Sequence, residues 1–240
     1  MGSQSQIKYH PKYLWFLVLS FSMIVAISNW YDARLIMLFG VIVTPGSLLF
    51  PLTFLLSDII TEVYGFKHAR RAIWVALLFN AIFISYGKIL TLLPSPEFSN
   101  YEALDKLINM DFWIITASFT SYIIAEPLNA YLLAKLKIIT KGKYVGIRFI
   151  ASTIIASTID TPLFVLIAFH STLSLEKMNS MIFSIWFIKC IVEIGLLPFS
   201  ISLTKIIKNK ERLNIYDINT NFTPFSIDVT YPLDDNKFER

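Results

Sequence analysis

The chain has 240 residues, of which 55% are hydrophobic and only 16% are charged, and its mean hydropathy is +0.60. Soluble domains carry about 25% charged residues, so this composition excludes an ordinary soluble globular protein and is typical of an integral membrane protein. The formal net charge of +4 and the pI of 9.0 do not indicate nucleic-acid binding, because the basic residues are spread over short segments between apolar runs.

Two long uncharged runs open the chain. Tyr13 to Tyr31 and Leu35 to Ser57 contain nineteen and twenty-three residues, each enough to cross a hydrocarbon core of about 30 Å at about 1.5 Å per residue. A signal peptide is the alternative for the first run, but that run is long and no small-x-small cleavage site closes it. We predict an all-α polytopic membrane protein with six transmembrane helices, at about 14–30, 34–57, 71–93, 112–136, 147–170 and 178–206.

The second predicted span is interrupted by Thr44-Pro45-Gly46, and Pro51 follows. Proline removes a backbone donor and clashes with the preceding turn, and such breaks persist in a bilayer only where protein or water satisfies the freed carbonyl groups. Broken helices often mark transporter sites, and a packing kink is the alternative. We therefore expect a structural or gating role for Pro45 and Pro51.

The distribution of Lys and Arg predicts the orientation. If the N-terminus, the second and fourth loops and the C-terminus share one side, fourteen basic residues lie near span ends on that side and four on the other. The positive-inside rule then places both termini in the cytoplasm and requires an even number of spans.

The polar segments outside the spans are short. The acidic loop from Pro94 to Asp111 contains two prolines, and we expect a short surface helix in it. We assign residues 1–207 to a six-span transporter domain and residues 208–240 to a polar cytoplasmic tail. The tail is too short for a core of its own, so we expect it to be partly ordered against the cytoplasmic face or simply flexible.

Signatures of enzymes and metal sites are missing from the sequence. Cys190 is the only cysteine, which excludes an internal disulfide and a cysteine metal cluster. There is no HExxH, no Gly-rich phosphate loop and no GxSxG, and these would indicate a metalloprotease, a nucleotide site or a hydrolase. We expect no metal ion, no cofactor and no enzymatic activity.

Polar residues interrupt the apolar spans in groups with helical spacing. A central Asp, Lys or Arg costs about 2.5–3.5 kcal/mol on insertion scales, so such residues should face the bundle interior and find partners there. Spacings of three or four residues place the members of each group on one helix face. The groups are Asp58 and Glu62, Glu126 and Asn129, Ser157 with Asp160 and Thr161, and Lys189 and Glu193.

Structural explanations exist for two of these groups. Asp58 and Glu62 could serve only as partners for the basic residues at 67, 70 and 71, and Lys189 with Glu193 could form an internal ion pair. Glu126 and Asp160 have no nearby cation in their own spans, and a buried carboxylate needs a partner or a proton. The excess of acids suits a cationic or donor-rich ligand, or a transferable proton.

The segment FPLTFLLSDIITEVYGFKHARR at 50–71 resembles the signature of the YhhQ-type queuosine precursor transporters, also called the vitamin uptake transporter family. Asn29, the spacing of Lys189 and Glu193 before Pro198, and the ending IYDINTNFTPF at 215–225 are also similar to that family. The resemblance implies a six-span protein of the bacterial inner membrane that imports 7-deazaguanine bases, the precursors of a tRNA wobble modification.

Four positions depart from the family pattern. Glu126 and Asn129 stand where the family has Gln-x-x-Asp, Ser157 replaces a Gln, and Leu197 replaces a Thr before Pro198. We expect these changes to reshape the wall of the site for a different base or a different precursor size.

A guanine-like edge has adjacent donors that carboxylates accept and a carbonyl that an amide or a lysine can bind. Aromatic residues, 15% of the chain, can stack on the flat ring. We assign Asp160 and Glu126 to the donor edge, Asn129 and Lys189 to the carbonyl, and Glu193 to orienting Lys189 or carrying a proton. Further candidates are Asn29 and Ser157 for substrate binding, and Asp58, Glu62, Arg70 and Arg71 for structure or gating.

The expected cargo is therefore 7-cyano-7-deazaguanine, 7-aminomethyl-7-deazaguanine or queuine, moved by a secondary or facilitated mechanism, with membrane lipid as surroundings and no nucleic-acid partner. Two alternatives stay open: a substrate-binding membrane module that needs an external energising partner, and an intramembrane enzyme. The latter lacks a nucleophile with a base. Association of two copies into a homodimer is left open by the sequence.

Overall fold

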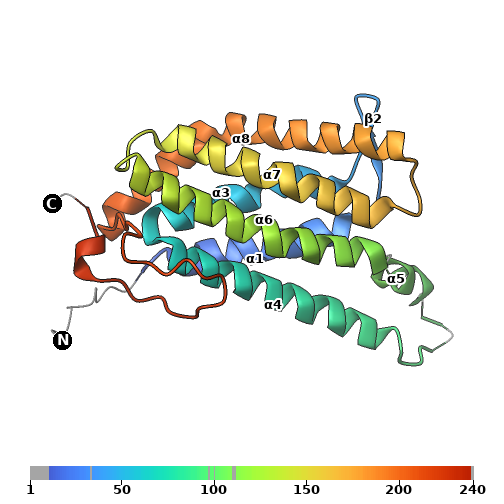
Figure 1. The fold of residues 1–240 in the computed structure, drawn as a ribbon. Coiled ribbons are helices and arrows are strands. Elements are labelled where there is room, and N and C mark those ends of the chain that lie inside the picture. Colours follow the sequence, from blue (N-terminus) through green and yellow to red (C-terminus); the bar gives the residue numbers. More distant parts are fainter. Residues whose placement is uncertain (1–10, 33, 97, 100, 110–111, 239–240) are drawn as a thin grey trace.

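The computed structural model describes residues 11–32, 34–96, 98–99, 101–109 and 112–238. The chain forms one bundle of long helices lying side by side (Figure 1). Both termini lie at one end of the bundle, which we call the terminal end, and a small β-hairpin lies at the other, the hairpin end (Figure 1). The helices are α1 (Leu14–Tyr31), α2 (Pro45–Leu49), α3 (Pro51–Tyr64), α4 (Phe66–Leu90), α5 (Tyr101–Ile108), α6 (Phe112–Ile139), α7 (Val145–Phe169) and α8 (Leu175–Glu211).

Five helical segments are long and apolar enough to cross a membrane within the described part of the chain. They are α1, the pair α2 and α3 taken together, α4, α7 and α8. Helix α6 has 28 residues and lies among them in the bundle, but it carries Glu126, Lys135 and Lys137 (Figure 1). The mostly helical fold and the membrane class expected from composition are confirmed. The expected surface helix of the acidic loop is α5.

The beginning predicted for the second span, near residue 34, is wrong. Strands β1 (Ile36–Leu38) and β2 (Val41–Val43) pair antiparallel there, with Leu38 opposite Val41. The two residues between them, Phe39 and Gly40, have φ angles of 51° and 83°, as a two-residue hairpin turn requires. A run of β-branched residues beside such a turn favours strands even though the segment is apolar.

A broken helix follows the hairpin. The Thr44 hydroxyl accepts a hydrogen bond from the Ser47 amide at 3.3 Å, which caps α2, and Pro45 is the first helical residue. Phe50 alone separates α2 from α3, whose first residue is Pro51. Both prolines therefore begin helices, where the missing amide would have no partner.

Helix α3 is the centre of the bundle. All its residues except Leu52 are buried, and it packs against α1, α4, α6, α7 and α8. The outer helices expose large apolar side chains instead, such as Trp15 at 65% and Phe183 at 65%. A helix that is buried on every side, inside a ring whose outer face is apolar, is what lipid as the surrounding solvent requires.

The segment after α8 folds back over the terminal end. Its Asp217 carboxylate accepts hydrogen bonds from the Phe66 amide at the start of α4, at 3.0 and 3.2 Å, and from the Tyr231 hydroxyl at 2.7 Å. Burial raises the pKa of Asp217. The Tyr231 hydroxyl in turn accepts a hydrogen bond from the Lys67 amide at 2.8 Å. The tail segment therefore provides hydrogen-bond acceptors for backbone amides in the first turn of α4 that have no partner within the helix.

Two basic residues of the 50–71 segment, Lys67 and Arg70, bind the same tail. The Arg70 guanidinium, 2% exposed, donates to the carbonyls of Asn221, Thr223 and Asp228. The Lys67 ammonium lies 2.7 Å from the Asp228 carboxylate and lowers its pKa below the ordinary value. A lowered pKa means that this contact stabilises the tail above about pH 4 and that the contribution is lost as the pH falls further. Arg71 is exposed.

We expect Arg70→Gln to detach the tail. Hydrogen bonds from a charged group contribute about 1.5–3 kcal/mol each, so losing them should raise the population of the open tail at least about tenfold, and cleavage follows that population. Limited proteolysis within residues 218–230 measures it. Arg71→Gln is the matched control, and equal cleavage of both variants would contradict the role of Arg70.

Candidate functional site

Buried polar side chains form three groups along the bundle axis. The cavity group, nearest the hairpin end, consists of Asp32, Asp160, Thr161 and Lys189. The middle group consists of Asp58, Glu126, Asn129 and Glu193. The Glu62 group, at the terminal end, consists of Glu62, Lys137, Arg148 and Lys208. All are less than 9% exposed except Lys208, which is half-buried.

The cavity group is built around an ion pair between α8 and α7. The Lys189 ammonium lies 2.5 Å from the Asp160 carboxylate and 3.3 Å from the Thr161 hydroxyl. It also sits 5.0 Å from the centre of the Phe50 ring, the residue between α2 and α3. These side chains line a cavity of about 20 Å³, which has room for about one water molecule.

Asp32 borders the same cavity and was missed by the sequence interpretation. It follows α1 directly and is 6% exposed, and its Oδ1 has no hydrogen-bond partner among the described residues. The absence of a side chain at Gly46 leaves room for Asp32 in this position, because a Cβ on residue 46 would overlap the Asp32 carboxylate and the Ser28 carbonyl. The available signal was the three-residue spacing from Asn29, which places the two residues on one helix face.

Asn29 lies one layer behind the cavity. Its side-chain oxygen accepts a hydrogen bond from the Ser118 hydroxyl of α6, and Ser118 itself lines the cavity. Asn29 thus positions a wall residue and does not line the cavity itself. Ser157, one turn from Asp160 on α7, is fully buried, and its hydroxyl has no hydrogen-bond partner in the described structure.

The middle group joins α6 to α3. The Asn129 amide donates to Asp58 Oδ1 at 2.7 Å, and the Thr53 hydroxyl donates to Glu126 Oε1 at 2.7 Å. Glu126 does not line the cavity, although its carboxylate is within electrostatic range of Asp160. Glu193 is 2% exposed, and neither of its carboxylate oxygens has a partner in the part of the chain that the structure describes.

An internal pair between Lys189 and Glu193, one of the alternatives from sequence, is therefore wrong. The two side chains are four residues apart on α8, but the lysine turns to Asp160 on the neighbouring helix. The shared helix face makes both residues point inward without determining which neighbour each one binds.

The Glu62 group binds four elements together. Arg148 of α7 donates to both Glu62 oxygens, at 2.6 and 3.0 Å, and Lys208 of α8 lies 2.6 Å from Oε1. Lys137 of α6 is 3.7 Å from the same oxygen and donates to the carbonyls of Glu62 and Ile215. The alternative pairing of Asp58 and Glu62 with the basic residues at 67, 70 and 71 is wrong. Lys67 and Arg70, in the first turns of α4, bind the tail, and Arg71 is exposed.

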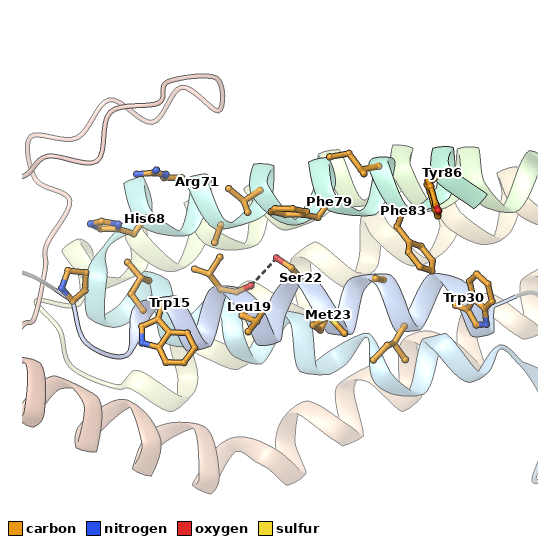
Figure 2. A pocket seen from close by; sticks show the side chains of 18 of the residues that line it. Trp15, Leu19, Ser22, Met23, Trp30, His68, Arg71, Phe79, Phe83 and Tyr86 are labelled. Carbon is orange, nitrogen blue, oxygen red and sulfur yellow. Dashed lines mark hydrogen bonds between the residues drawn. The ribbon is translucent and has the colours of Figure 1, made fainter. Parts of the chain in front are cut away.

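A much larger hollow, of about 1150 Å³, lies elsewhere in the described structure. It is a groove between α1 and α4, lined by Trp15, Leu19 and Met23 on one side and by Phe79 and Phe83 on the other (Figure 2). His68 and Arg71 lie at one of its ends (Figure 2). Its apolar walls suit acyl chains of lipid. It contains no carboxylate, so it does not offer the chemistry that a polar heterocycle needs.

Among the described residues, no three His, Cys, Asp or Glu side chains are placed to hold a metal ion. At the cavity the described polar core offers several acceptors, the Lys189 ammonium group and the Phe50 ring. That set can bind a flat, donor-rich and uncharged or cationic solute.

Comparisons with known proteins indicate the family of the chain. Residues 44–203, two thirds of the chain, match the family model described as "Putative vitamin uptake transporter". No solved structure matches the chain.

Three curated proteins are similar to the chain. A "Probable queuosine precursor transporter" of Bacillus subtilis is 24% identical over 77% of this chain and 82% of its own length. One of the same name from Haemophilus influenzae is 30% identical over 54% and 53%, and the "Queuosine precursor transporter" of Escherichia coli is 28% identical over 66% and 69%.

We expect Glu62→Gln to destabilise the fold strongly. It removes the charge that compensates Arg148, Lys137 and Lys208, and breaking a buried pair in this way costs about 3–5 kcal/mol. Thermal unfolding of the purified protein in detergent measures the effect, with Glu176→Gln, an exposed position at the start of α8, as the control. Equal melting temperatures for the two variants would contradict the central role of Glu62.

Proposed function

Because the chain belongs to the vitamin uptake transporter family, we propose that it carries a queuosine precursor, a 7-deazaguanine base, across the bacterial inner membrane. The arrangement proposed is six spans, with α6 as the fourth and with both termini in the cytoplasm, as the distribution of basic residues indicates. The observation that carries the substrate assignment is the ion pair of Lys189 with Asp160 at a cavity that Asp32 and Phe50 also line.

The chemistry of this cavity suits a guanine-like edge. The carboxylates of Asp160 and Asp32 can accept from the ring N–H and the exocyclic amine, which are adjacent donors on such a base. The Lys189 ammonium can donate to the base carbonyl, and the Phe50 ring can stack on the heterocycle. The Lys189 ammonium is paired with Asp160 before the substrate binds, and it can donate a further hydrogen bond to the base while it keeps this ion pair.

The cavity as observed is too small for a base, so substrate entry requires movement of its walls. The elements best placed to move are α2 and the start of α3, because Pro45 and Pro51 interrupt the helix there and Phe50 lies at the break. Discontinuous helices of this kind let a substrate meet backbone groups at the depth of the membrane. In this proposal the cavity of about 20 Å³ belongs to a closed state of the transporter.

The alternative of a binding module that depends on an external energising complex predicts a different result. Purified protein in vesicles would then bind the base without moving it. Uptake into vesicles that contain only this protein excludes that alternative. Turnover of a lipid or peptide by the purified protein would instead favour an enzyme.

A complementation assay tests the substrate class. A queuosine-synthesis mutant that lacks its own importer receives this chain and is fed single precursors, and the modified tRNA is measured. We expect rescue by at least one 7-deazaguanine base. Absence of rescue by all of them, with the protein present in the membrane, would overturn the assignment.

In the same assay we expect Asp160→Asn to abolish rescue, because it removes both an acceptor for the base and the partner of Lys189. Membrane insertion is measured in parallel, since loss of a buried partner also destabilises. Asp234→Asn, an exposed carboxyl in the tail, is the control. Normal rescue by the Asp160 variant would return this residue to a structural role.

Asp32→Asn tests the residue that the sequence interpretation missed. It leaves the pair of Lys189 and Asp160 intact, so the fold is less at risk. Loss of one charge-assisted hydrogen bond, worth about 1.5–3 kcal/mol, should raise the substrate concentration for half-maximal uptake at least about tenfold. An unchanged value would exclude Asp32 from the binding site.

A further inference from the structure

The middle group has an excess of hydrogen-bond acceptors. Among the described residues, Asp58 Oδ2, Glu126 Oε2 and both oxygens of Glu193 have no hydrogen-bond partner. The same holds for Oδ1 of Asn129, an amide acceptor that is fully buried and whose other atom donates to Asp58. An amide acceptor without a donor, beside carboxyl oxygens without donors, indicates that donors from outside the fixed protein atoms belong in this group.

The cations of the described bundle core already have ion-pair partners. Lys189 faces Asp160, and Arg148, Lys137 and Lys208 surround Glu62. Glu62 is within electrostatic range of Asp58, and Asp160 is within range of Glu126. Other titratable groups nearby include Cys190 of α8, within electrostatic range of Glu193, and Tyr122 of α6, whose hydroxyl donates to the Ile73 carbonyl. Helix α2 and strand β2, which also pack on α8, contain no titratable residue.

Three buried carboxyl groups thus have no ion-pair partner among the described residues, and Lys189 acts on Glu126 only from beyond ion-pair distance. Asp58 is within electrostatic range of both Glu193 and Glu126, so the three groups would repel one another if all were ionised. Buried like charges in a medium of low dielectric constant are relieved by binding protons. A protonated carboxyl also supplies the donor that Asn129 Oδ1 and the neighbouring carboxyl oxygens lack.

We propose that Asp58 and Glu193, with Glu126 beside them, form a proton-binding site, and that the protein is a proton-coupled transporter. This inference rests on the proposed function and adds its energy source. The carboxylate of Asp58 or Glu193 accepts a proton at a free oxygen from a hydronium ion of the water on one side of the membrane and returns it to the water on the other side, so the O–H bond formed on loading is the bond broken on release. No other bond is made or broken.

The position of the middle group suits coupling. On α8, Glu193 follows Lys189 by four residues, and on α3, Asp58 precedes Glu62 by four, a rise of about 6 Å in each case. The proton site therefore lies about one helical turn from the substrate cavity and about one turn from the Glu62 group. Movement of α3 when the cavity opens would shift Asp58 relative to Glu193, and loading of the cavity would thereby change the proton affinity.

Vesicles containing the purified protein test the coupling. With one proton per substrate, a gradient of one pH unit, acidic outside, should sustain about tenfold accumulation of 7-cyano-7-deazaguanine. A protonophore should abolish that accumulation. In Asp58→Asn and Glu193→Gln, which preserve side-chain shape, the ratio of gradient-driven accumulation to exchange of labelled for unlabelled base should fall at least about tenfold. Glu176→Gln on the same helix is the control.

Infrared spectroscopy tests the proton site without any substrate. Protonated carboxyl groups have a C=O stretching band distinct from that of carboxylates, and we expect such a band at neutral pH in the wild type and a weaker one in Asp58→Asn and Glu193→Gln. A band that is absent from the wild type or unchanged in both variants would overturn the site. Accumulation of the base to the same level with and without the pH gradient would overturn the proposed proton coupling. Failure of every base to move in either mode, with the band present, would instead refute the substrate assignment.

Discussion

The polar core depends on how few cations the bundle places inside it. In a medium of low dielectric constant each buried carboxylate needs a counter-charge, hydrogen bonds or a proton. The described helices supply one ammonium group at the depth of the cavity, Lys189, and it pairs with Asp160. Three further cations gather on Glu62 at the terminal end. What is left between them, the middle group, has acids and no cation.

This unequal distribution separates structural from functional acids. The Glu62 carboxylate accepts hydrogen bonds from Arg148 and Lys208, and the Lys137 ammonium lies 3.7 Å away. Glu62 thus joins α3 to α6, α7 and α8, and the protein compensates its charge. Asp160 is compensated by a lysine that can also donate to a base. Asp58, Glu126 and Glu193 each have at least one carboxylate oxygen without a hydrogen-bond partner in the part of the chain that the structure describes. The degree to which the protein satisfies each carboxylate thus follows its proposed role, from fastening the bundle, to substrate binding, to proton transfer.

The tail and the broken helix act on the two ends of the same central element. Helix α3 begins at the break with α2, beside the cavity. It ends close to the Glu62 group, at the point where the tail binds the start of α4. The 50–71 segment therefore does two things at once. Its apolar and acidic part forms the centre of the bundle, and its basic part, through Lys67 and Arg70, binds the returning tail.

The sequence by itself determined the membrane class, five of the predicted helices to within a few residues at one or both ends, the surface helix α5 and the inward-facing acids. These follow from local properties: uncharged length, helical spacing and the free-energy cost of a charge in lipid. The segment at 36–43 was missed because a short apolar hairpin has the same composition as the start of a span.

Only the tertiary structure decided the partners. Helical spacing shows which residues share one face but contains no information about which neighbouring helix packs there. A pair between Lys189 and Glu193 was therefore compatible with the sequence, whereas in the structure Lys189 pairs with Asp160. Asp32 entered the site because Gly46 of α2 lets the end of α1 approach closely. Contacts between residues more than eighty positions apart, such as Arg148 with Glu62 or Arg70 with the tail, depend on how the whole chain packs.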